Sequence, residues 1–99
     1  MAVERNPELL AAWRAHYKGD NNDAIERFNK IIASQPQNTD ALNGLGLAQK
    51  AVGDHLGARV TFRKLLDILE RKIEEDPDNE TRYRMEMRMI QQQIEMLDI

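Results

Sequence analysis

The chain repeats part of its sequence at a spacing of 34 residues. The matched pairs combine a turn-forming glycine, a small residue and an aromatic residue, and they are Gly19-Asp20 with Gly53-Asp54, Ala24 with Ala58, and Phe28 with Phe62. A period of about 20–50 residues indicates a supersecondary unit that buries its apolar face against neighbouring copies. The closing prolines, Pro36 and Pro77, are 41 residues apart, so the second unit carries 7 additional residues. This insertion corresponds to about two helical turns.

Each unit has the pattern of two helices joined by a short turn. Apolar residues recur at helical spacing over residues 23–34 and 55–75, and Gly19 and Gly53 end the helices that precede them. We expect a first hairpin over about residues 7–36, a second over about 39–76 and a terminal helix over about 80–98. No segment alternates as a strand does, so the predicted fold is all-α, with five helices in a single domain of residues 1–99.

Composition excludes several classes of protein. The chain has no cysteine, which excludes disulfides, thiolate zinc sites and cysteine nucleophiles. Residues 1–7 lack the apolar core of a signal peptide, and no apolar run approaches the roughly 20 residues of a membrane span. We therefore expect a cytoplasmic protein without a membrane partner. A net charge of -3 argues against nucleic-acid binding through a global field.

Residues that could support chemistry are scattered. His16 and His55 are 39 residues apart, and neither has a second histidine or an acid at metal-ligand spacing. The acidic run at residues 74–78 lacks the alternating ligands and central glycine of a calcium loop. No nucleophile with its base and no glycine-rich phosphate loop can be assembled. The prediction is a protein that is not an enzyme and uses no metal or cofactor.

The 34-residue period, the Ala-x3-Phe spacing and the closing proline resemble the tetratricopeptide repeat. The second unit retains Leu42, Leu45-Gly46, Ala58 and Phe62, but it has Leu42 where the family favours Trp and Gln49 where it favours Tyr. The similarity covers residues 7–79 well and the last helix only by position. It implies antiparallel hairpins stacked as a short right-handed solenoid, whose first helices line a concave groove that receives a peptide or helix of a partner protein.

Alignment with the family implies which residues face this groove. They are Leu9, Trp13, His16, Tyr17, Asp40, Asn43, Leu47, Lys50, Thr81, Arg84, Arg88 and Gln91. The positions of the clamp with which some members hold chaperone carboxylates are Leu9, Trp13, Gly44, Thr81 and Met85. None carries the clamp residue, so that ligand is not expected. Two alternatives stay open: Trp13 belongs to the groove or to the core, and Arg84 and Arg88 bind an anion or serve solubility.

The last helix is predicted to be apolar on two sides. One stripe, expected to pack on the preceding helix, is Tyr83, Met87, Ile90, Ile94 and Leu97. The other, rotated by about 200 degrees, is Met85, Met89, Met96 and Ile99. Uncovered apolar surface at the end of a repeat array favours association. The primary hypothesis is thus a peptide-binding module for protein–protein interaction, and the alternative is a structural scaffold unit that forms a homodimer through this second stripe.

Overall fold

The structure is a computed structural model that describes residues 6–97. Over these residues the chain forms five α-helices and one short 3-10 turn, without a strand, which confirms the all-α prediction. The elements are α1 (Pro7–Tyr17), α2 (Asn21–Ser34), α3 (Thr39–Ala51), α4 (His55–Glu75), η1 (Pro77–Asn79) and α5 (Glu80–Leu97). No helix of this part of the chain is long and apolar enough to cross a membrane.

Local signals set the ends of the helices. The Asn6 side chain accepts hydrogen bonds from the backbone N–H groups of Glu8 and Leu9, which caps α1. Asn38 caps α3 in the same way through the N–H of Ala41. The turns after α1 and α3 use Gly19 and Gly53 at φ 89° and 85°, a left-handed conformation in which a Cβ atom would be strained. Because these signals are local, the hairpin turns follow directly from the sequence.

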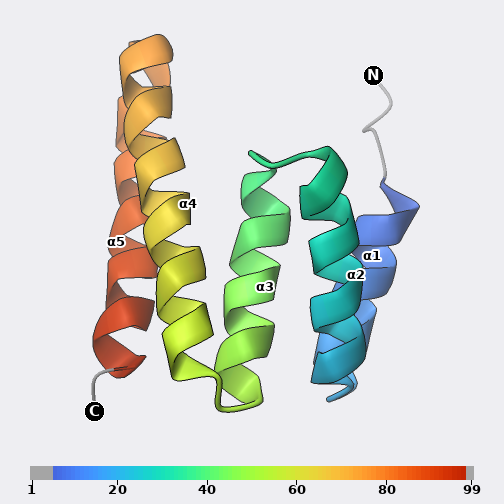
Figure 1. The fold of residues 1–99 in the computed structure, drawn as a ribbon. Coiled ribbons are helices and arrows are strands. Elements are labelled where there is room, and N and C mark those ends of the chain that lie inside the picture. Colours follow the sequence, from blue (N-terminus) through green and yellow to red (C-terminus); the bar gives the residue numbers. More distant parts are fainter. Residues whose placement is uncertain (1–5, 98–99) are drawn as a thin grey trace.

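Helices that follow one another in the chain lie side by side, with α3 between α2 and α4 (Figure 1). Helix α1 also contacts α3, whereas α5 packs mainly along α4. One buried cluster joins α1, α2 and α3 around Phe28, and a second joins α3, α4 and α5 around Phe62. Both phenylalanines are fully buried. Of the residues repeated at 34-residue spacing, the alanine and phenylalanine pairs therefore lie in the two clusters.

Two glycines of α3 permit this close packing. A Cβ atom on Gly44 would lie 2.2 Å from Cζ of Phe28, and one on Gly46 would lie 2.4 Å from Cε1 of Phe62. The aromatic ring of each hairpin thus rests directly on the α3 backbone. Gly46, which the second unit retains from the tetratricopeptide pattern, thus serves the approach of α4, and Gly44 is its counterpart for the first hairpin.

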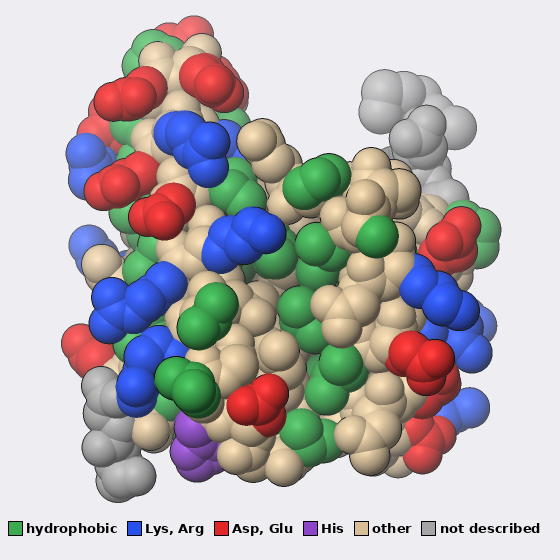
Figure 2. All heavy atoms as spheres, viewed as in Figure 1, with side chains coloured by type: hydrophobic (Ala, Val, Ile, Leu, Met, Phe, Trp, Pro, Cys, Tyr) green, Lys and Arg blue, Asp and Glu red, His purple; other side chains and the backbone are tan. Residues whose placement is uncertain are grey.

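The two C-terminal helices are long and packed together. Helix α4 has 21 residues and α5 has 18, and α4 extends beyond the end of α3 (Figure 1). The first predicted stripe of α5 lies in this contact, with Tyr83, Ile90, Ile94 and Leu97 buried and Met87 partly buried. On the face shown in Figure 2, acidic and basic side chains gather over α4. The inserted turns therefore keep one apolar side and one charged side.

Candidate binding groove

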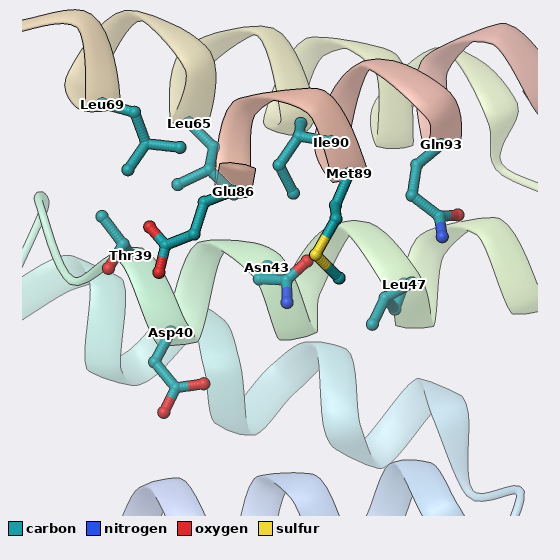
Figure 3. A pocket seen from close by; sticks show the side chains of 10 residues that line it. All are labelled: Thr39, Asp40, Asn43, Leu47, Leu65, Leu69, Glu86, Met89, Ile90 and Gln93. Atoms are coloured by element: carbon teal, nitrogen blue, oxygen red, sulfur yellow. The ribbon is translucent and has the colours of Figure 1, made fainter. Parts of the chain in front are cut away.

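A hollow of about 510 Å³ lies between α3 and α5, and α4 also contributes side chains to its lining (Figure 3). We call it the α3–α5 hollow. It is lined by Thr39, Asp40, Asn43 and Leu47 of α3, Leu65 and Leu69 of α4, and Glu86, Met89, Ile90 and Gln93 of α5. The two helices of the second hairpin and the helix that follows it thus contribute to one depression.

Apolar and polar side chains both line the hollow, and Asn43 lies beside Met89 in its middle (Figure 3). Leu65 and Leu69 belong to the buried cluster and lie behind the space that separates α3 from α5. Met89 projects from α5 toward α3, and its side chain is 65% exposed. Glu86 and Asp40 lie toward one end, whereas Gln93 and Leu47 lie toward the other (Figure 3). Apolar side chains with a few polar groups among them are the usual composition of a ligand site.

The neighbouring space between α1 and α3 is closed by Trp13. Its indole Nε1–H donates a hydrogen bond of 3.1 Å to Oδ1 of Asp40. The indole ring stacks on Tyr17 at 5.8 Å and meets Phe28 edge-on at 5.3 Å. Trp13 is only half-buried. It therefore packs against the first cluster and also holds a carboxylate that lines the hollow.

The far end of the hollow has a cation bridging α3 and α5. Lys50 Nζ donates to Oε1 of Gln93 at 2.9 Å and lies 3.9 Å from Sδ of Met96. Both partners are neutral. The Lys50 ammonium group thus lies beside the hollow, opposite the end that holds Asp40 and Glu86.

The structure brings only part of the predicted groove together. Asn43 and Leu47 line the hollow, Asp40 shares it, and Lys50 borders it through Gln93. Leu9 packs partly buried against the first cluster. The other first-helix residues are placed separately: His16 Nδ1 lies 2.6 Å from Oδ1 of Asn21, and Tyr17 is 77% exposed.

Arg84 lies elsewhere. It lines a different depression, between α4 and α5, together with Glu70 and Glu74, and its Nε donates to Oε2 of Glu80 at 2.6 Å. The remaining predicted residues of α5, which are exposed and do not line the α3–α5 hollow, are Thr81, Arg88 and Gln91. Two residues of α5 that do line the hollow, Glu86 and Gln93, lie two positions after the predicted Arg84 and Gln91.

The α5 residues missed in the groove prediction had a signal in the sequence. Ile90 belongs to the apolar stripe that packs on α4, and Glu86 and Gln93 lie beside that stripe on a helical projection. Alignment carried across the 7-residue insertion placed the groove on another side of the helix. The helical period of α5 itself would have oriented this side correctly.

The second stripe of α5 is uncovered. Met85, Met89 and Met96 are 61%, 65% and 52% exposed. Met89 also lines the hollow, so the stripe and the hollow are continuous. Ile99, the fourth residue predicted for self-association, lies outside the described residues.

A polar cluster at the corner between α4 and α5 serves the fold. Asn79 Nδ2 and Tyr83 Oη donate to Oδ2 of Asp76 at 2.8 and 2.9 Å. These hydrogen bonds, with that of Asn79 first, hold the pKa of Asp76 below its usual value. The bond to Asp76 raises the pKa of Tyr83. Within residues 6–97, no group of three or more His, Asp or Glu side chains is placed to hold a metal ion.

Comparisons of the chain with protein-family models, curated proteins and solved structures find no match. The similarity to the tetratricopeptide repeat therefore stays a prediction from the sequence motifs. The geometry of the α3–α5 hollow is the principal guide to function.

Proposed function

We propose that this chain is a non-catalytic protein-interaction module that binds a peptide segment of another protein in the α3–α5 hollow. The observation that carries the proposal is the hollow itself, which lies between two helices and is lined by apolar side chains together with several polar groups. Its volume of about 510 Å³ is within the range of about 300–1,000 Å³ that is typical of ligand sites. Several side chains of a bound segment would fit.

The repeat pattern supports the same proposal. In a tetratricopeptide-like arrangement, the two hairpins stack as a short right-handed solenoid, and α1, α3 and α5 are the helices that line the concave side. Two of these three helices border the hollow, and α1 is tied to it through Trp13 and Asp40. A concave surface formed by first helices is the usual binding surface of such repeats.

The test uses peptides selected from a random 12-residue display library on the wild-type protein. Met89→Asp places a charge in the hollow, and Met85→Asp makes the same change on an equally exposed part of the same helix that does not line it. We expect Met89→Asp to weaken binding of the selected peptides at least tenfold in fluorescence anisotropy, and Met85→Asp to leave it unchanged. Circular dichroism checks that both variants are folded.

Peptides that bind wild type and Met89→Asp equally, or a library that yields no specific peptide, would contradict binding in the hollow. A loss of affinity in both variants would move the contact to the wider methionine stripe.

The exposed methionines favour a second candidate function, a scaffold unit that self-associates through α5. Exposed apolar side chains aligned on one helix face are a common basis for association between copies. Met85 and Met96 lie on this stripe and do not line the hollow. We expect the double variant Met85→Glu with Met96→Glu to be a folded monomer in light scattering if the wild type is a dimer. A wild type that is monomeric at high micromolar concentration would exclude this candidate.

A further inference from the structure

The charges at the two ends of the α3–α5 hollow specify its occupant more closely. We infer that the bound segment carries an Arg or Lys side chain beside Asp40 and Glu86 and an Asp or Glu side chain beside Lys50, with apolar residues between them. This inference rests on the proposed function, because it describes what the hollow binds. The docking surface is the apolar hollow, and the charges set the sequence and direction of the ligand.

The acidic end combines carboxylates from two helices. Asp40 belongs to α3 and Glu86 to α5, both side chains are exposed, and both lie at the same end of the hollow (Figure 3). None of the ten described residues that line the hollow is basic. Two carboxylates at one end of the hollow favour a cation bound beside them. A guanidinium suits this place because its planar fork donates two parallel hydrogen bonds to a carboxylate.

Trp13 prepares the acidic end for such a ligand. The hydrogen bond from its indole N–H uses Oδ1 of Asp40 and orients the carboxylate, and a carboxylate retains further acceptor sites. Trp13 is itself held by the rings of Tyr17 and Phe28. A charged group held in place by packing loses little entropy when it binds its partner.

The basic end has the complementary property. Lys50 bridges to Gln93 and Met96, two neutral side chains, so a carboxylate of the ligand can pair with its charge. Asp40 and Lys50 are ten residues apart on α3. At about 1.5 Å per residue this separation corresponds to about 15 Å along the helix. An extended peptide spans it with about five residues, the middle ones over Asn43 and Met89 and the next over Leu47.

The experiment selects the random 12-residue library on four proteins: wild type, Glu86→Lys, Lys50→Glu and the control Glu95→Lys. Glu95 is an exposed acid on α5 that does not line the hollow. Its replacement by Lys therefore makes the same change in net charge as Glu86→Lys without altering the hollow. From wild type and the control we expect peptides in which Arg or Lys is separated from Asp or Glu by about four apolar or small residues. Replacing the cation of the strongest peptide by Gln should weaken its binding to wild type about tenfold.

The variants separate the possible results. Selection on Glu86→Lys should no longer enrich peptides with Arg or Lys, and selection on Lys50→Glu should no longer enrich peptides with Asp or Glu. The peptides are synthesised with an amidated C-terminus, so that only their side chains supply a carboxylate. Peptides without a charge pattern whose binding is sensitive to Met89→Asp would overturn this inference and leave the proposed function intact. A charge preference that Glu95→Lys also abolishes would overturn it as an effect of net charge. Selected peptides insensitive to Met89→Asp would overturn both proposals.

Discussion

Replacing Gly44 by alanine tests the packing that holds the two hairpins together. The new methyl group would lie 2.2 Å from Cζ of Phe28, and it would approach two further ring atoms to 2.4 and 2.7 Å. Nonpolar carbons prefer a separation of about 3.5–4.0 Å. The ring would therefore have to retreat by more than about 1 Å, although Phe28 is fully buried and Trp13 lies against it.

Two opposing effects set the magnitude. Alanine favours a helix interior over glycine by about 1 kcal/mol. Overpacking a close-packed core costs about 1–3 kcal/mol, and three contacts below 3.0 Å place this site near the upper limit. We expect a net loss of about 2 kcal/mol in the free energy of unfolding. At about 4–8 °C per kcal/mol for a chain of this size, the Tm falls by about 8–16 °C.

Thermal melting of a double-mutant cycle provides the assay. Phe28→Leu shortens the side chain and removes the ring atoms nearest to the new methyl group. In that background Gly44→Ala should no longer be destabilising, with a coupling energy of about 2–3 kcal/mol between the two sites. A Gly44→Ala variant that melts at or above the wild-type temperature would refute the reasoning, as would an equal loss in both backgrounds.

Three further outcomes follow from the same structure. Phe62→Ala should lower the free energy of unfolding by about 3–5 kcal/mol in urea titration, because it empties the centre of the second cluster; a change below 1 kcal/mol would contradict that burial. Trp13→Ala should lower the melting temperature through lost packing, and Trp13→Phe should isolate the hydrogen bond to Asp40 at about 1 kcal/mol; melting of Trp13→Ala at the wild-type temperature would assign this residue to binding alone. Hydrogen bonds lower the pKa of Asp76 in the folded protein from its usual 3.8. The ionised Asp76 carboxylate therefore stabilises the fold above about pH 3.8, and this stability is lost as the pH falls through the lowered pKa of the folded state. Asp76→Asn should therefore flatten the acid limb of the stability–pH curve, and an unchanged limb would show that this carboxylate does not contribute.

The helices could be predicted from the sequence because their signals are local. The cap at Asn38, the glycine turn at Gly53 and the proline after α4 act within a few residues, and the expected long helix over residues 55–75 is α4 as observed. The core could be predicted as well, since the apolar period places Phe28 and Phe62 on the buried sides of their helices.

The hollow could be predicted only in part, because it depends on how α3 and α5 face each other. Asn43 and Leu47, which alignment with the tetratricopeptide family places in the groove, line the hollow. The α5 positions crossed the insertion, and a two-residue offset on a helix rotates a side chain by about 200 degrees. Arg84 therefore lies in another depression, and Glu86 takes its place in the hollow.

The repeat also explains why the hollow lies between α3 and α5 rather than between α1 and α3. The residue 34 positions after Trp13 is Leu47. The leucine side chain has no ring to fill the space beside the next helix and no N–H group to donate a hydrogen bond across to it. The contact that joins α1 to α3 thus has no counterpart at the equivalent position, and Leu47 lines an open surface instead. The proposed binding specificity consequently lies where the second unit departs from the first, at Leu47 and on the face of α5 that carries Glu86 and Met89.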